Sequence, residues 1–197
     1  MNRRHFVRLG SAVPLGAFPH HLFAAAEKKL ASDVIELGPR KVKVSRLAMG
    51  SGTNGGGGSS NQTKRLGLKG MGDLLRAASD NGVFFWDCAD QYGTHPHAKE
   101  GLKSVPREKV AILSKTHAST EAEMKADIDR FRREIGTDYI DILLLHCMMD
   151  ANWPERKRGA MEYINELQAK GIVRTKGVSC HTLAALKTAA ATPWVEV

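Results

Sequence analysis

Polar residues of a chemically useful kind end four strand-like segments of this 197-residue sequence. Asp87 ends VFFWD, Lys115 ends KVAILSK, His146 ends YIDILLLH and Ser179 falls at the end of VRTKGVS. They are 28, 31 and 33 residues apart, and Tyr92 follows the first of them closely. Each residue alone is compatible with a solvated strand tip or a hydrogen-bonded core position. Their regular spacing predicts instead that all five converge on one site.

An acid, a phenol, an ammonium and an imidazole together could carry out proton transfer at a carbonyl group. A phenol is a poor proton donor at neutral pH because its ordinary pKa is about 10. A nearby ammonium lowers the pKa of a phenol, and a carboxylate paired with the ammonium keeps it charged and in place. A neutral imidazole can orient the carbonyl oxygen that receives the proton. No side chain supplies a hydride, so we expect a nicotinamide cofactor.

These residues need a scaffold that brings the ends of successive strands together. Helical spacing and stop signals alternate along the chain with short apolar segments. The clearest helix begins with a capping box of Thr120 and Glu123 and ends at Gly136. The sequence predicts a hairpin and first strand within 33–50, strands at 83–87, 109–115, 139–146, 173–179 and 194–197, and helices at 71–82, 97–105, 119–136, 154–171 and 182–191.

This alternation predicts an α/β fold with a parallel sheet, either doubly wound or closed into a barrel. A barrel places functional side chains at the carboxyl ends of successive strands, as Asp87, Lys115 and His146 are placed. We therefore expect a (βα)8 TIM barrel, of which residues 27–197 hold about the first five and a half βα units.

The segment 51–60, SGTNGGGGSS, predicts a flexible loop after the first strand. Its glycines suggest a phosphate-binding loop as an alternative. No G-K-[ST] follows, however, and the predicted helix begins too late, at Met71.

The motifs around these residues resemble the aldo-keto reductase family. They are D-x-A-x-x-Y-G at 87–93, S-K-T at 114–116 and L-L-L-H at 143–146, with further similarity in KVSRLAMGSGT and GIVRTKGVS. The resemblance runs from about residue 34 to the end of the sequence. It implies a (βα)8 barrel that uses NADP(H) to reduce small aldehydes and ketones or to oxidise the alcohols.

By this resemblance, Tyr92 is the proton donor, Asp87 and Lys115 are the pair that tunes it, and His146 orients the carbonyl group.

The resemblance also implies three contacts with the cofactor. Gly50 and Ser51 align with residues beside the nicotinamide, and Ser179 aligns with a serine at its carboxamide. The family commonly has asparagine after that serine, where this sequence has Cys180 followed by His181.

The family's barrel has eight strands, whereas this sequence stops inside the sixth. We therefore expect an incomplete member of the family. The alternative is a truncated, non-catalytic barrel remnant that lacks the site for the cofactor's phosphates.

A zinc site is a competing interpretation, because cysteines and histidines gather at the strand ends: Cys88, Cys147, Cys180, His117, His146 and His181. Side chains along a strand alternate between its faces. If Asp87 and His146 point into the barrel, Cys88 and Cys147 should point toward the helices. We therefore expect no metal.

Residues 1–26 predict a Tat-type signal peptide. Paired Arg3 and Arg4 precede a short apolar stretch, and Ala24 to Ala26 offers a cleavage site. The stretch is too short and too interrupted to anchor the chain in a membrane. We expect export by the Tat machinery to the periplasm or the extracellular space, and the alternative is a disordered basic N-terminus.

The remaining composition excludes some other classes. The net charge is +8, and the 26 N-terminal residues contribute three of the 29 basic residues and no acid. The rest of the chain is mildly basic and has no basic stripe interleaved with aromatic residues, so we expect no nucleic-acid partner. Three cysteines without a C-x-x-C motif argue against a disulfide framework.

Overall fold

A computed structural model describes residues 28–197 of the chain. The predicted signal peptide, residues 1–26, lies outside the described residues. Within the described range, no helix is both long and apolar enough to cross a membrane.

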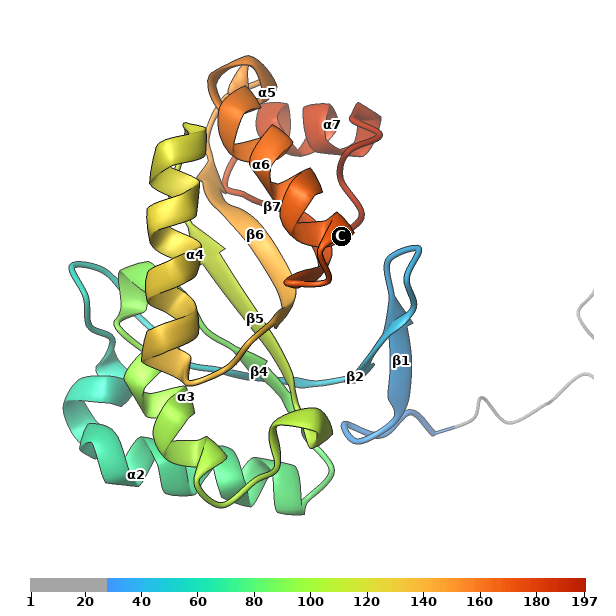
Figure 1. The fold of residues 1–197 in the computed structure, drawn as a ribbon. Helices are drawn as coiled ribbons and strands as arrows, with labels where there is room; N and C mark the ends of the chain where they lie inside the picture. The colour runs from blue at the N-terminus through green and yellow to red at the C-terminus, as the bar shows by residue number, and fades with distance from the viewer. Residues whose placement is uncertain (1–27) are drawn as a thin grey trace, which may run out of the picture.

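A five-stranded parallel sheet forms the centre of the molecule (Figure 1). Its strands, in spatial order, are β3 (Ala48–Gly50), β4 (Phe85–Asp87), β5 (Ala111–Thr116), β6 (Ile140–Met148) and β7 (Val173–Cys180). Every neighbouring pair is parallel, so the carboxyl ends of all five strands meet at one edge. The apolar strand β6 is buried along most of its length, as expected when both faces are covered.

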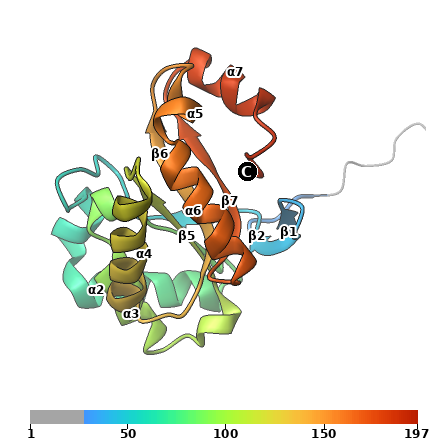
Figure 2. The same cartoon turned by 45° about the horizontal axis from the view of Figure 1, so that its top comes forward.

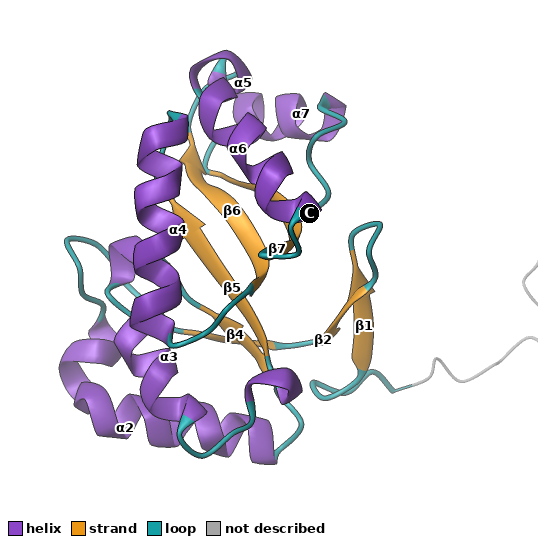
Figure 3. Cartoon of the chain, viewed as in Figure 1, coloured by secondary structure: helices purple, strands orange, loops and turns teal. Residues whose placement is uncertain are grey.

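Helices cover one face of this sheet (Figures 1 and 3). The side chains between the two layers form the larger core, which includes Trp86, Ile112, Phe131, Leu143 and Ile164. The helical elements are α2 (Asn61–Asp80), the 3-10 turn η1 (Asp90–Tyr92), α3 (His95–Leu102), the 3-10 turn η2 (Arg107–Lys109), α4 (Glu121–Ile135), α5 (Trp153–Arg156), α6 (Arg158–Ala169) and α7 (Leu183–Ala191).

An antiparallel hairpin covers the amino-terminal end of the opposite face. It consists of β1 (Val34–Leu37) and β2 (Val42–Ser45). Val42 and Val44 pack with Ala111, Ile142 and Leu144 in a second, smaller core. Because side chains alternate along a strand, Lys115 and His146 lie on this same face, farther toward the carboxyl edge.

The predicted α/β architecture with a parallel sheet is confirmed, and the capping box of Thr120 and Glu123 opens α4 as expected. The helix predicted at 71–82 begins earlier, at Asn61, with Ser60 as its cap. Its first turns, NQTKRLGLKG, are polar and glycine-rich and are interrupted at Gly67, which hides the helical period.

Two further elements differ from the prediction. The helix predicted at 154–171 is divided into α5 and α6, because Lys157 between them departs from helical geometry. The segment 194–197 is no regular strand, although Glu196 and Val197 donate backbone hydrogen bonds to the Lys176 carbonyl of β7. The end of the chain therefore runs beside β7 (Figure 2).

Candidate active site

The four residues predicted to be catalytic come together at the carboxyl edge of the sheet. Asp87 ends β4, Lys115 is the fifth residue of β5 and His146 lies in β6. Tyr92 ends the 3-10 turn η1 that follows β4. The parallel pairing of β4, β5 and β6 is therefore what positions three of the four side chains.

The Lys115 side chain is buried and holds its ammonium beside the tyrosine. Its Nζ atom donates to a carboxylate oxygen of Asp87 and, at 3.1 Å, to the carbonyl oxygen of Cys88. Nζ also lies 4.9 Å from the centroid of the Tyr92 ring. Within residues 28–197, the ammonium pairs directly with one charge, the Asp87 carboxylate, so a fixed positive charge faces the phenol.

The Tyr92 ring is held in place by the loop predicted to be flexible. A Cβ atom added at Gly52 or at Gly55 would overlap the Tyr92 ring, so both glycines lie in close contact with it. Gly93 has φ +61° and passes close to the backbone of Gly58. These contacts require residues without side chains, which explains Gly52 and Gly55 as packing against the tyrosine.

The His146 imidazole lies against the Tyr92 hydroxyl. The distance between Tyr92 Oη and His146 Nε2 is 3.3 Å. Burial, together with the positive charges of Lys115, His117 and His181, lowers the pKa of His146 to about 4. At neutral pH only about one molecule in a thousand would carry a protonated His146. The His146 imidazole is therefore neutral at pH 7 and can act there as a hydrogen-bonding group.

A cavity of about 280 Å³ adjoins the imidazole, and its lining includes His117, His146, Cys147 and Lys157. The ring of His117 stacks on that of His146, with centroids 4.9 Å apart. This cavity gives small molecules access to His146.

Comparisons with known proteins identify the family of this chain. The model of the aldo/keto reductase family matches residues 46–197. The chain belongs to the aldo/keto reductase family. The NAD/NADP-dependent indole-3-acetaldehyde reductase of Schizosaccharomyces pombe is 31% identical over 132 residues, which cover 62% of this chain and 45% of that protein.

Solved structures of aldo/keto reductases share the fold. The enzyme from Brucella melitensis superposes with a TM-score of 0.63 at 17% identity, over 83% of this chain and 59% of that one. The Klebsiella pneumoniae enzyme, solved with NADP and acetate, gives 0.61 at 22% identity, over 79% of this chain and 52% of that one. The predicted barrel class is thus confirmed, and the chain spans about half the length of these relatives.

The three residues expected to contact a cofactor differ in what they can offer. Gly50 is exposed at the end of β3, beside Asp87 in the sheet register, and the space above it is open. The Ser51 hydroxyl is buried and donates to the Asp87 carbonyl oxygen at 2.7 Å. The Ser179 hydroxyl accepts from the Cys147 amide at 2.8 Å and retains its own proton for another acceptor. Gly50 therefore leaves open space and Ser179 keeps a hydroxyl proton, whereas the Ser51 hydroxyl is already engaged.

The geometry is less favourable to a shared thiolate site. Cys88 is packed in the helical core, where burial raises the pKa of its thiol to about 11, and a metal-binding thiolate would be costly there. The alternation that predicted the same direction for Cys147 fails. Its φ of +62° and the register shift after Leu145 form a bulge that turns Cys147 to the cavity beside His146.

Sequence reasoning missed the residues that hold Tyr92. The spacing G-x-G-x-x-G is present after the first strand of the sheet, at Gly50, Gly52 and Gly55. The helix begins only at Asn61, so the loop does not open directly into a helix as a dinucleotide-binding fingerprint does. The acidic residue Asp90 inside the D-x-A-x-x-Y-G motif was also missed as a contact point.

Proposed function

We propose that this chain carries the active site of an NADP(H)-dependent oxidoreductase that reduces aldehydes or ketones, or oxidises the corresponding alcohols. The observation that carries the proposal is the hydroxyl of Tyr92 lying 3.3 Å from the neutral His146, with the Lys115 ammonium beside the same ring. This arrangement is a general acid next to a hydrogen-bonding group that does not compete for the role of proton donor.

In this proposal each polar residue has one task. Tyr92 gives its hydroxyl proton to the substrate oxygen as negative charge develops on it. The Lys115 ammonium stabilises the phenolate that remains, and the Asp87 carboxylate keeps that ammonium in position. His146 donates from Nε2 to the same substrate oxygen, which fixes the carbonyl group against the tyrosine. In alcohol oxidation the phenolate removes the proton instead.

A nicotinamide cofactor would supply or accept the hydride when it is bound. We propose that Gly50 leaves room for its ring and that the Ser179 hydroxyl donates to its carboxamide. Ser51 serves this site indirectly, because its buried hydroxyl ties the end of β3 to β4 at the Asp87 carbonyl. Support for the cofactor comes from relatives: the yeast protein is named NAD/NADP-dependent, and the Klebsiella enzyme was solved with NADP.

The test measures NADPH consumption by the natural full-length protein with a panel of small aldehydes and ketones. Tyr92→Phe removes one hydroxyl, so we expect NADPH affinity to be retained while reduction falls by roughly two to four orders of magnitude. Tyr163→Phe on α6 is the matched control and should retain the wild-type rate. Reduction by Tyr92→Phe at the wild-type rate would exclude the proposed acid. A protein that binds no NADPH would favour the non-catalytic remnant.

We also propose that residues 1–26 direct export by the Tat machinery to the periplasm or the extracellular space. The basis is the paired Arg3 and Arg4 ahead of a short apolar stretch. Replacing both arginines with lysine should leave the precursor inside the cell, because a receptor reads the pair itself rather than its charge. Normal export and cleavage of the double variant would show that the assignment is wrong.

A further inference from the structure

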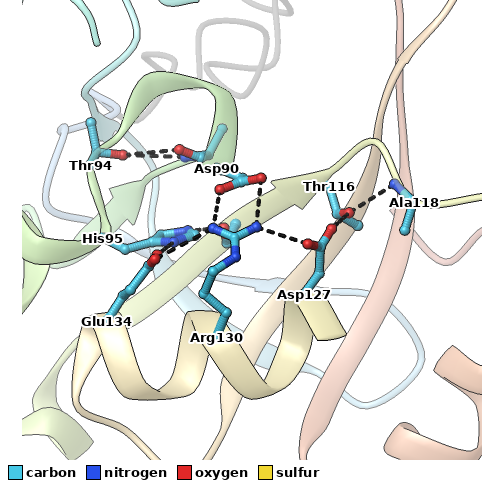
Figure 4. A network of polar contacts seen from close by, with 10 residues as sticks. Asp90, Thr94, His95, Thr116, Ala118, Asp127, Arg130 and Glu134 are labelled. Atoms are coloured by element: carbon cyan, nitrogen blue, oxygen red, sulfur yellow. Dashed lines mark hydrogen bonds and ion pairs between the residues drawn. The ribbon is translucent and has the colours of Figure 1, made fainter. Parts of the chain in front are cut away.

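One arginine on the helical side of the sheet connects several acidic residues behind the tetrad. Arg130 of α4 donates to both carboxylate oxygens of Asp90, at 2.6 and 2.9 Å (Figure 4). The same guanidinium contacts Asp127 at 2.8 Å and Glu134 at 3.4 Å. Burial disfavours the charged form of Asp90, but the hydrogen bonds from Arg130 outweigh it, and the pKa of Asp90 is lowered. The pair is therefore ionised at neutral pH.

The Asp90 end of this network fixes the turn that carries Tyr92. Asp90 is the first residue of η1 and Tyr92 is its last. The turn is a single short piece, in which the Tyr92 amide donates to the Ala89 carbonyl and the Gly93 amide donates to the Asp90 carbonyl. A bidentate contact at Asp90 restrains both the position and the rotation of this turn, and with them the direction of the tyrosine.

The Asp127 end fixes the strand that carries Lys115. Asp127 accepts a hydrogen bond from the hydroxyl of Thr116, the residue that follows Lys115 in β5. Thr116 is fully buried, and its hydroxyl oxygen also accepts from the Ala118 amide at 2.9 Å. A single guanidinium thus connects the backbone segments of the proton donor and of its ammonium partner.

A buried histidine continues the network on the other side of Arg130. His95 contacts Glu134 through Nδ1 at 2.9 Å and the Ser114 hydroxyl through Nε2 at 2.7 Å. Serine, histidine and glutamate in this order resemble a hydrolase triad, but Ser114 and His95 are both buried and no substrate can reach them. Ser114 precedes Lys115 in β5, so this branch also supports the strand.

The same cluster could be taken for a metal site, because ligand atoms of Asp90, His95 and Glu134 lie within 4.8 Å of one another. The Arg130 guanidinium already contacts both carboxylates, so a cation is in place. The donors are arranged around the arginine rather than around an empty centre.

We propose that Arg130 is a positioning residue, which sets the Tyr92 hydroxyl relative to the Lys115 ammonium through Asp90 and Asp127. The proposal rests on the proposed function for its kinetic consequence, but not for its structural one. Displacement of a reacting group by about 1 Å can reduce a rate by about a hundredfold. Loss of the contacts of Arg130 with Asp90 and Asp127 should therefore lower kcat, and the binding of substrate and cofactor should change little.

The experiment compares Arg130→Met with Arg107→Met in the natural full-length protein. Arg107 also makes several hydrogen bonds, but it lies at the other end of the sheet and has no contact with η1. Its loss should therefore cost stability without moving Tyr92. Asp90→Asn and the double variant Asp90→Asn/Arg130→Met complete a cycle. The readouts are kcat and KM, the melting temperature, and the ¹³Cζ signal of Tyr92, which is assigned by its loss in Tyr92→Phe.

We expect Arg130→Met to lower kcat by roughly 10- to 100-fold with KM near the wild-type value, and to shift or broaden the Tyr92 signal. Arg107→Met should leave both unchanged while it lowers the melting temperature. The double variant should have the same kcat as Arg130→Met alone, because Asp90→Asn weakens the Arg130–Asp90 contact that Arg130→Met already removes. If Arg130→Met does not fold, Arg130→Lys takes its place. Lysine keeps the positive charge but cannot make the bidentate contact with Asp90, so kcat should fall by part of the same factor.

Two results would overturn the proposal. One is an unchanged Tyr92 signal in Arg130→Met, or in Arg130→Lys if that variant replaces it. The other is an equal change of the signal in Arg107→Met, which would mark a merely structural role. Because the signal is read without turnover, it decides the inference even if the wild-type protein reduces no carbonyl compound. In that case only the proposed function fails.

Discussion

The two ends of the parallel sheet use charged residues in opposite ways. At the amino-terminal end, the buried Asp141 receives hydrogen bonds from Arg107 at 2.7 Å, from Arg174 at 2.8 Å and from the Ile112 amide at 2.9 Å. The ring of Tyr139 lies beneath both guanidinium groups, about 4 Å from each (4.0 and 4.1 Å). The two guanidinium groups share the one carboxylate, every oxygen of which is hydrogen-bonded, and the tyrosine serves as a packing surface.

At the carboxyl end, the polar groups are left less completely paired. The Lys115 ammonium has one carboxylate partner and faces the ring of Tyr92. His146 Nδ1 is buried and has no hydrogen-bond partner among the described residues. Such arrangements cost stability and are retained where chemistry needs them. The amino-terminal end of the sheet is thus paired for stability, and the carboxyl end keeps less fully paired groups where barrels of this class usually have their active sites.

The largest expected effect comes from removing the cation at the carboxyl end. Lys115→Met should lower carbonyl reduction in the full-length protein by two to four orders of magnitude, the range of a lost general acid, because the phenolate of Tyr92 loses its stabilising charge. The melting temperature should change little, since Asp87 is one-third exposed and water can solvate it. Steady-state kinetics and thermal unfolding of the same preparations check both parts. A large loss of stability with retained activity would show that Lys115 serves the stability of the fold and not the reaction.

The matched substitution at the amino-terminal end should give the opposite result. Arg107→Met leaves the buried Asp141 with one of its two arginines and frees the carbonyls of Val110 and Tyr139. Breaking a buried pair of this kind costs about 3 kcal/mol. We expect a clearly lower denaturant midpoint and a kcat close to wild type. A Lys115-like loss of activity in this variant would show that the two ends are not separate in function.

The sequence predicts the carboxyl end better than the amino-terminal end. Asp87, Tyr92, Lys115 and His146 are recognisable because strand order and motif spacing are properties of the chain itself. Asp141 and Arg107 carry no such signal: they are charged residues within or beside apolar runs, and their pairing depends on tertiary contact. The fold class follows from the alternation of elements for the same reason that the tetrad does.

Other features could not be read from the sequence because they depend on local backbone geometry. The bulge at Cys147 reverses the expected direction of its side chain, and nothing in LLLHCMM indicates a positive φ. The early start of α2 is hidden by polar residues. The contact of Arg130 with Asp90 joins residues 40 positions apart, although the spacing of Asp127, Arg130 and Glu134 on one helical face was a usable signal.

A substitution in the loop 51–60 should have a smaller effect at the carboxyl end. Gly52→Ala places a methyl group where the Tyr92 ring lies, so the ring or the loop must move. We expect a loss of roughly 10-fold or more in kcat, from misplacement of the hydroxyl. Gly56→Ala is the control, because its added methyl group would meet Gln91 Nε2 at an ordinary contact distance of 3.5 Å. Equal rates for the two variants would argue against a role of the loop in holding the tyrosine.

The smallest expected effect is a dependence of stability on pH that belongs to the carboxyl end. Burial and neighbouring positive charges lower the pKa of His146 to about 4, whereas an unfolded histidine has a pKa of about 6.5. Between these values the unfolded state binds more protons, so the stabilisation is complete above about pH 6.5 and is lost as the pH falls toward 4.

At pH 5 the loss from this one residue should be on the order of 1 to 2 kcal/mol relative to pH 7. His146→Asn cannot titrate, so its free energy of unfolding should fall less over the same interval. The pKa values of His95, His97 and His117 are also lowered by burial, but these residues act in both proteins, and the difference isolates His146. Urea unfolding of the two proteins at several pH values measures that difference. Parallel pH profiles would mean that the fold does not hold His146 neutral, and the proposal that Tyr92 rather than His146 donates the proton would lose its support.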